Sequence, residues 1–249
     1  MNPLVAEFIG TALLVTFGNG VVANVLLART KGNNSGWIVI TAGWALAVFV
    51  GVFSSQAASG AHLNPAVTVA MAQAGKFAWS SVPGYVLAQL LGGIAGATLV
   101  FLFYREHFKV SEDKSGKLAC FCTAPNIRNL PQAFLCELIG TFLLVLPVFL
   151  MTDARLTLPA SFGTQNEVII GLGTLGALPV GLLVFAIGLS LGGTTGYAIN
   201  PARDLGPRIA HALLPVPGKG DSDWRYAWIP VVAPLLGGLL AAWAHVVLR

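Results

Sequence analysis

The chain is 249 residues long, with 55% apolar residues, only 10% charged residues and a mean hydropathy of +0.76. Because soluble domains carry about 25% charged residues, this composition indicates a polytopic membrane protein and excludes an ordinary soluble domain. The formal net charge of +4 is a small excess, so it does not indicate nucleic acid as a partner. The three cysteines, Cys120, Cys122 and Cys136, show no disulfide or metal-ligand spacing, and we expect neither a metal nor another cofactor.

Six apolar runs are long enough to cross about 30 Å of hydrocarbon, which takes about 20 helical residues. They cover approximately residues 4–27, 37–56, 80–104, 131–152, 165–189 and 224–248. The first run lacks the basic segment and cleavage site of a signal peptide, so we expect it to be retained. Two shorter runs, 64–74 and 200–213, cannot span alone, but two that enter from opposite faces and meet would cover about one bilayer.

The chain also repeats itself. Residues 6–15 align with residues 136–145 at an offset of 130, and residues 59–68 align with 195–204 at an offset of 136. Each half holds three spans and one short run, so the halves must insert in opposite senses, as in an inverted repeat. We therefore predict an all-α membrane protein with six transmembrane helices and two re-entrant half-helices, as a single transmembrane domain over residues 1–249. Its parts are repeat 1 (about 1–104), a loop (105–130) and repeat 2 (about 131–249).

Charge does not settle the orientation. With the N-terminus in the cytoplasm, most Lys and Arg residues fall outside, which conflicts with the positive-inside rule. Much of that excess lies in the long loop 105–130, where the rule is weak.

Each short run begins with the same three residues, Asn-Pro-Ala. Asn is a strong helix N-cap, and Pro suits the first helical position because it has no N–H to leave unpaired. Two helix N-termini that meet at the midplane, each with about half a positive charge, disfavour a cation and favour a neutral molecule with lone pairs. The two boxes are Asn64, Pro65 and Ala66 in the first half and Asn200, Pro201 and Ala202 in the second.

Four charged side chains within the membrane also need a role. Arg203 follows the second box, where a cation opposes the helix dipole, and we interpret it as a pore-lining donor that repels cations. Asp204 beside it is expected to offset part of that cost. Glu7 and Glu137 occupy matching places in the two repeats, and a structural role as hydrogen-bond acceptors is favoured over a proton relay.

The residues before each box are expected to run as extended strands. Irregular backbone at membrane depth is tolerated where it lines a wet cavity. Its unpaired carbonyls could then form a ladder that accepts hydrogen bonds from a permeant. His62 is interpreted as a satisfied loop histidine rather than a gate. The ladder residues are Gly60, Ala61, His62 and Leu63, with Gly196, Tyr197, Ala198 and Ile199.

No catalytic pattern is present: the sequence lacks a nucleophile elbow, a phosphate-binding glycine loop and a metal-ligand cluster, so we expect no enzyme. The aromatic residues near the span ends are expected to form the interfacial belt of a membrane protein. These are Trp37, Trp79, Trp224, Tyr226 and Trp228.

The paired Asn-Pro-Ala boxes, six spans and internal repeat resemble the aquaporin and glycerol-facilitator family over essentially the whole chain. The resemblance implies a selectivity filter at Trp44, Gly188, Tyr197 and Arg203. Water-selective members typically have Phe and His at the first two places, so Trp44 and Gly188 resemble the glycerol-conducting branch. Asp204 resembles that branch as well. Tyr197 departs from the usual Phe, which leaves the relative rates of water, glycerol and urea open.

Apolar residues should line the opposite side of the path. Val48 and Val184 lie one turn from Trp44 and Gly188 and should face the same way by i,i+4 spacing. Leu14 and Leu144, each seven residues beyond its glutamate, are the other candidates, with plain core packing as the competing interpretation.

The resemblance implies a passive channel for glycerol and related small neutral polyols that also passes water and excludes protons and ions. It further implies a homotetramer in a cell (inner or plasma) membrane, surrounded by lipid, and the short termini favour a bacterial source. One alternative is a channel mainly for water or another small neutral solute such as urea. An alternative of another class is a junction or scaffold protein with a vestigial pore.

Overall fold

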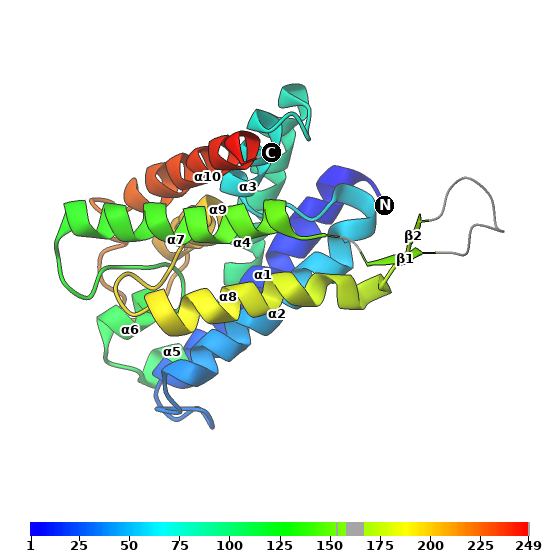
Figure 1. The fold of residues 1–249 in the computed structure, drawn as a ribbon. Coiled ribbons are helices and arrows are strands. Elements are labelled where there is room, and N and C mark those ends of the chain that lie inside the picture. Colours follow the sequence, from blue (N-terminus) through cyan, green and yellow to red (C-terminus); the bar gives the residue numbers. More distant parts are fainter. Residues whose placement is uncertain (153, 158–166, 249) are drawn as a thin grey trace.

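The six long helices and the two half-helices follow one another along the chain in the order that the apolar runs predict (Figure 1). The structure is a computed structural model and describes residues 1–152, 154–157 and 167–248. Within these residues the long helices are α1 (Pro3–Leu26), α2 (Trp37–Ser59), α4 (Val82–Phe103), α7 (Leu130–Leu150), α8 (Leu178–Leu191) and α10 (Ile229–Val247). The half-helices α3 (Pro65–Gln73) and α9 (Pro201–Leu213) follow the second long helix of each half.

Short elements fill the connections. The 3-10 turns η1 (Trp79–Ser81) and η3 (Gly173–Ala177) precede α4 and α8. Segment 105–130, expected to be a loop, holds the short helices α5 (Arg105–Val110) and α6 (Lys114–Ala119). Between α7 and α8, strands β1 (Arg155–Thr157) and β2 (Glu167–Ile169) pair in an antiparallel hairpin.

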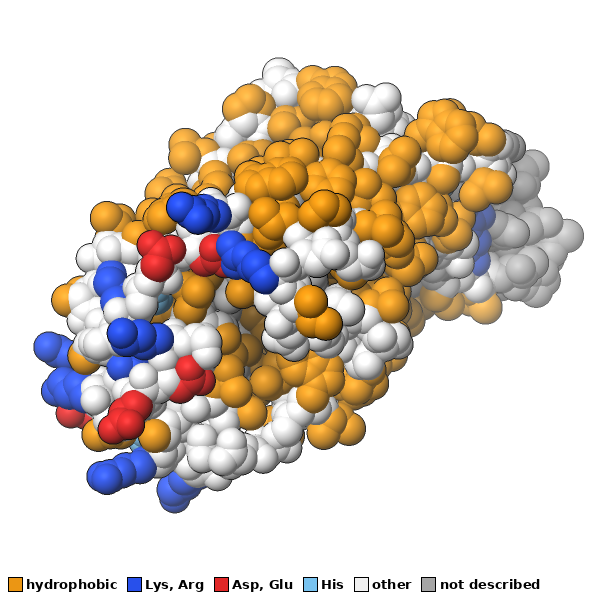
Figure 2. Space-filling view, turned by 90° about the vertical axis from the view of Figure 1, so that its left-hand side faces the viewer, with side chains coloured by type: hydrophobic (Ala, Val, Ile, Leu, Met, Phe, Trp, Pro, Cys, Tyr) orange, Lys and Arg blue, Asp and Glu red, His pale blue; other side chains and the backbone are white. Residues whose placement is uncertain are grey.

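Six segments of 19 to 25 residues, with mean hydropathies of 1.6 to 2.3, can cross a membrane. At 1.5 Å per residue they are about 28–38 Å long, which matches the hydrocarbon core. Hydrophobic side chains cover much of the face in Figure 2, while Lys, Arg, Asp and Glu gather at one end. Four of the five expected belt residues are exposed, but Tyr226 is fully buried, so its assignment to the belt is wrong.

Two expected spans begin later than predicted. The span expected at 165–189 becomes helical only at Gly173, after β2; residues 165 and 166 lie outside the described residues. Hydrophobicity alone cannot separate a short apolar strand from a helix, and the glycines after Ile170 favour a turn. The span expected at 224–248 begins at Ile229, because Pro230 in the first helical turn sets the start of α10.

The two repeats exchange contacts through their half-helices. Helix α9 of the second repeat packs against α4 of the first, and α3 packs against α10. In each contact a glycine faces the carbonyl of the box alanine: a Cβ on Gly93 would lie 2.6 Å from the Ala202 oxygen, and one on Gly238 would lie 2.8 Å from the Ala66 oxygen. Small residues at these crossings let the backbones approach closely.

Replacing Gly238 by Ala would therefore push α10 away from the first box. We expect Gly238→Ala to lower the free energy of unfolding by about 1–3 kcal/mol, the usual cost of overpacking. The measurement is the denaturation midpoint of the detergent-solubilised protein. Gly20→Ala is the matched control, because nothing lies within 4 Å of its Cβ position in α1. Equal midpoints for the two variants would contradict the close-packing explanation.

Candidate functional site

Both boxes start their half-helices in the same way. Asn64 has extended backbone, and its side-chain oxygen accepts a hydrogen bond from the Ala66 N–H at 2.9 Å. The Asn200 oxygen accepts from the N–H groups of Ala202 and Arg203 at 3.0 and 3.3 Å. Pro65 and Pro201 occupy the first helical position. The sequence signal for a helix start therefore operates twice, at the centre of the bundle.

The two boxes also bind each other. The Asn64 amide donates to the Ile199 carbonyl and the Asn200 amide to the Leu63 carbonyl, both at 2.8 Å. These reciprocal bonds bring the two half-helix N-termini together, as the repeat predicts. Each amide NH₂ has two N–H donors and uses one in this bond, so one donor on each asparagine remains available.

A cavity of about 850 Å³ passes these asparagines. Its lining includes Asn64, Asn200 and Arg203, and it extends to residues of the α7–α8 connection such as Ile169 and Leu172. The box prolines and alanines do not line it but lie buried behind the asparagines. All four expected wall residues do line the cavity: Leu14, Val48, Leu144 and Val184.

Three of the four expected filter residues meet at this cavity. Trp44, Tyr197 and Arg203 line it, and the Arg203 guanidinium lies 4.1 Å from the centroid of the Trp44 ring. Arg203 also donates to the Gly196 carbonyl at 3.2 Å. Such a stack of a cation on an aromatic face stabilises a buried charge. The arrangement presents N–H donors beside an aromatic surface.

Gly188 differs from the expectation. It does not line the cavity, because the Tyr197 ring lies over it: a Cβ on Gly188 would lie 2.9 Å from the ring carbon Cζ. The space that a glycine leaves at this position is thus filled by the Tyr197 ring and is not left open.

The segments before the boxes are not extended strands. Ala61 and Leu63 have φ of 53° and 50°, and Tyr197 and Ile199 have φ of 38° and 43°, all in the left-handed region. The strand prediction was wrong because the polar anchors described next bend the backbone, which propensity cannot reveal. Seven of the eight expected ladder residues line the cavity; the exception is Gly196, whose carbonyl binds Arg203.

Two buried glutamates hold these bends. Glu7 accepts hydrogen bonds from the His62 and Leu63 N–H groups at 2.9 and 2.7 Å, and from the Ser59 hydroxyl at 2.6 Å. Gln89 donates to it as well, at 2.7 Å. Both glutamates are fully buried. This geometry is that of a backbone anchor.

Glu137 repeats the pattern in the second half. It accepts from the Ala198 and Ile199 N–H groups at 3.0 and 2.8 Å and from the Thr195 hydroxyl at 2.7 Å. His62, in the first segment, contacts Thr68 and packs on the Phe77 and Tyr85 rings, as a satisfied loop histidine does.

Asp204, expected to offset part of the cost of the neighbouring Arg203 charge, forms its ion pair with Arg208. Its carboxylate accepts two hydrogen bonds from Arg208, at 2.9 and 2.8 Å, and two from Thr123, at 2.7 and 2.6 Å. Arg208 lies one turn further along α9, so i,i+4 spacing on the helix favours this pair over the adjacent residue. The ion pair is fully buried and fastens segment 105–130 to the second half-helix.

Sequence reasoning missed the residues that seat the filter. A Cβ on Gly18 would lie 2.2 Å from the Trp44 ring, so this glycine of α1 makes room for it. Trp37 and Thr123 lie behind the filter as well, the former against Tyr197 and the latter against Gly196. A contact between distant segments leaves no local signal in the sequence.

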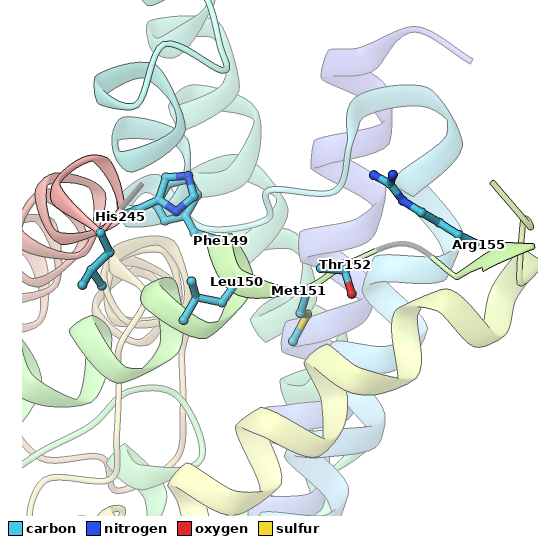
Figure 3. A pocket seen from close by; sticks show the side chains of 7 residues that line it. Phe149, Leu150, Met151, Thr152, Arg155 and His245 are labelled. Atoms are coloured by element: carbon cyan, nitrogen blue, oxygen red, sulfur yellow. The ribbon is translucent and has the colours of Figure 1, made fainter. Parts of the chain in front are cut away.

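A second, smaller pocket adjoins this cavity and shares Met151 and Thr152 with it. It has a volume of about 320 Å³, and its lining comes from the end of α7, from α10 and from β1 (Figure 3). None of the expected site residues lines it; the lining residues are Phe149, Leu150, Met151, Thr152, Arg155, His245 and Leu248. Among the described residues there is also no cluster of side chains that could hold a metal ion.

Residues 1–245 match the family described as Major intrinsic protein. The chain belongs to this family. It is 52% identical to a probable glycerol uptake facilitator protein of Thermotoga maritima, over 97% of both chains. It is 41% identical to a D/L-lactic acid transporter of Lactiplantibacillus plantarum, over 98% of this chain and 96% of that protein.

A solved structure has the same fold. The aquaglyceroporin from Plasmodium falciparum matches with a TM-score of 0.78 and 32% sequence identity, over 97% of this chain and 93% of that chain. The aquaporin-like fold expected from the repeat is therefore confirmed. With its six spans and bacterial relatives, the chain is a multi-pass bacterial membrane protein.

The buried pair of Asp204 and Arg208 gives a stability prediction. Asp204→Asn leaves the guanidinium buried without a counter-charge, so we expect a loss of about 3–5 kcal/mol in the free energy of unfolding. The measurement is thermal unfolding in detergent, with Asp221→Asn as the control because Asp221 is exposed. If both variants unfold at the wild-type temperature, Asp204 does not anchor this region.

Proposed function

We infer that this chain is a passive transmembrane channel for glycerol and related small neutral polyols, with water as a second permeant. The observation that carries the proposal is the cavity of about 850 Å³, whose lining combines polar groups with apolar side chains. Glycerol has hydroxyl groups along one edge and a carbon backbone along the other, so it suits such a path. The glycerol facilitators among the relatives support the same solute.

The polar part of the lining supplies both kinds of hydrogen-bonding group. Arg203 and the two asparagines offer N–H donors, and the carbonyls of residues 60–62 and 197–198 accept no hydrogen bond from the described residues. A hydroxyl both donates and accepts, so it can replace its water partners along this lining. Flow then follows the concentration gradient and needs no cofactor or reaction step.

Ions and protons are excluded by the same groups. Two half-helix N-termini point at the waist, and Arg203 lies beside the aromatic constriction, so a cation meets positive potential twice. The asparagine N–H groups also donate to the oxygen of a water molecule at the waist and so fix its orientation. A water held in this way hinders proton transfer along a chain of hydrogen-bonded waters. We assign the roles of filter to Trp44, Tyr197 and Arg203, and of waist to Asn64 and Asn200.

The channel comprises the whole chain as one domain, inserted in a bacterial cell membrane and assembled as a homotetramer. The family resemblance supports the assembly, and the outward apolar faces of the spans are available to lipid and to neighbouring copies.

The proposal is tested by light scattering of proteoliposomes. After a glycerol gradient is applied, vesicles with the channel should shrink and then swell again faster than empty vesicles, because glycerol follows the water. A sorbitol gradient measures water flow alone, and an internal pH dye reports proton leakage. Glycerol influx no faster than in empty vesicles would falsify the proposal.

The other outcomes separate the alternatives. Water or urea flux without glycerol flux would identify a channel for water or another small solute. No flux of any solute would favour a scaffold protein. The lactic acid transporter among the relatives adds undissociated lactic acid as a second candidate solute, whose flux should rise as the pH falls because the neutral form becomes more abundant.

Gly188 provides a sharper test of the filter. In Gly188→Ala the new methyl group presses on the Tyr197 ring and moves it toward the path. We expect glycerol flux to fall by about tenfold, as an added barrier of about 1.4 kcal/mol requires, while water flux falls by less than about twofold. Gly193→Ala is the matched control, because nothing lies within 4 Å of its Cβ position. An equal loss of both solutes in Gly188→Ala would count against the assigned filter.

A further inference from the structure

The Tyr197 ring is held by packing and by no hydrogen bond of its own. Its hydroxyl is buried without a partner among the described residues. Its backbone is left-handed and lies between the half-helix and α8, outside any helix. Whatever packs on the ring therefore decides how far it projects into the path.

One side of this ring packs on two glycines, one within α8 and one at its C-terminal end. Cβ atoms on Gly188 and Gly192 would lie 2.9 and 2.4 Å from ring carbons of Tyr197. These glycines let the ring approach α8 closely, but they do not prevent it from sliding along the helix.

Trp37 packs against another side of the ring. It is the first residue of α2, and its ring meets Tyr197 edge-on, with centroids 6.0 Å apart and planes at 78°. Its indole N–H donates to the Gly188 carbonyl at 3.0 Å, and a Cβ on Gly192 would lie 2.8 Å from its ring. One side chain thus contacts the filter ring and both glycines that receive it.

An interfacial tryptophan needs none of these contacts. Trp79, Trp224 and Trp228 are exposed at span ends like Trp37, but none of them contacts a filter residue. Trp37 lies at the start of a span and is 39% exposed, as a belt residue would be. Its indole N–H, however, donates to the Gly188 carbonyl beside the filter.

We propose that Trp37 is a positioning residue that sets the width of the filter by holding Tyr197 against α8. This inference rests on the proposed function, since it assumes that Tyr197 faces the permeant. Without the tryptophan ring, the Tyr197 ring can slide along α8 into the vacated space and away from the path, so the permeability to the largest solutes increases most. Trp37 does not itself line the cavity, so it acts through Tyr197.

The test is the permeability of proteoliposomes to a series of polyols of three, four and five carbons, with water measured in parallel. Trp37→Leu loses both the indole donor and the ring edge. In this variant we expect the permeability to the five-carbon polyol, divided by the permeability to glycerol, to rise by about threefold or more, because pore width governs selection. Trp37→Phe keeps a ring and should shift the ratio less. Trp224→Leu is the matched control, at an exposed tryptophan without a filter contact.

The permeability ratios distinguish a positioning role of Trp37 from a general structural role. Partial misfolding lowers the flux of every solute by one factor and leaves the ratios unchanged, and unchanged ratios in both Trp37 variants would overturn the inference. In a Tyr197→Ala background, Trp37→Leu should have no further effect on the ratio; an undiminished effect there would show that Trp37 does not act through Tyr197. Failure of the wild-type channel to pass glycerol would instead overturn the proposed function, so the two failures are distinguishable.

Discussion

Backbone inside a membrane cannot use water as a partner, so every non-helical segment there needs an acceptor for its N–H groups. Glu7 and Glu137 meet that need, each with two consecutive N–H groups of the segment before a box. The glutamates bind these N–H groups from the side away from the cavity, and the left-handed turns leave carbonyls beside the cavity. The half-helices, the waist and the filter all depend on these two carboxylates, because the carboxylates hold in place the segment that leads into each half-helix.

The two repeats stabilise each other as well as themselves. Each box alanine rests on a glycine of the opposite repeat, and each box asparagine binds the carbonyl of the opposite segment. Neither half can place its own half-helix without the other. This mutual dependence explains why the site lies at the boundary between the halves, where small shifts would alter both at once.

Much of the fold and of the site could be predicted, because the signals in the sequence are local or repeated. The Asn-Pro pairs mark helix starts, long apolar runs mark spans, and the offset between the copies implies inversion. The seat of Trp44 on Gly18 and the contact of Trp37 with Tyr197 could not be predicted, because each joins segments whose geometry appears only after packing. The hairpin before α8 was missed for a different reason: its apolar residues have the hydrophobicity of a membrane span.

The backbone of the path is duplicated, but its chemistry is not. Three residues after its asparagine, the second repeat carries Arg203 and the first carries Val67, and both side chains line the cavity. A solute that arrives from the Arg203 side is sorted before it reaches the asparagines, whereas one from the Val67 side reaches them first. At equilibrium the two routes are equivalent, since a passive path cannot favour a direction. A blocking molecule, however, has different sites to bind at each mouth, so inhibition can be one-sided where transport is not.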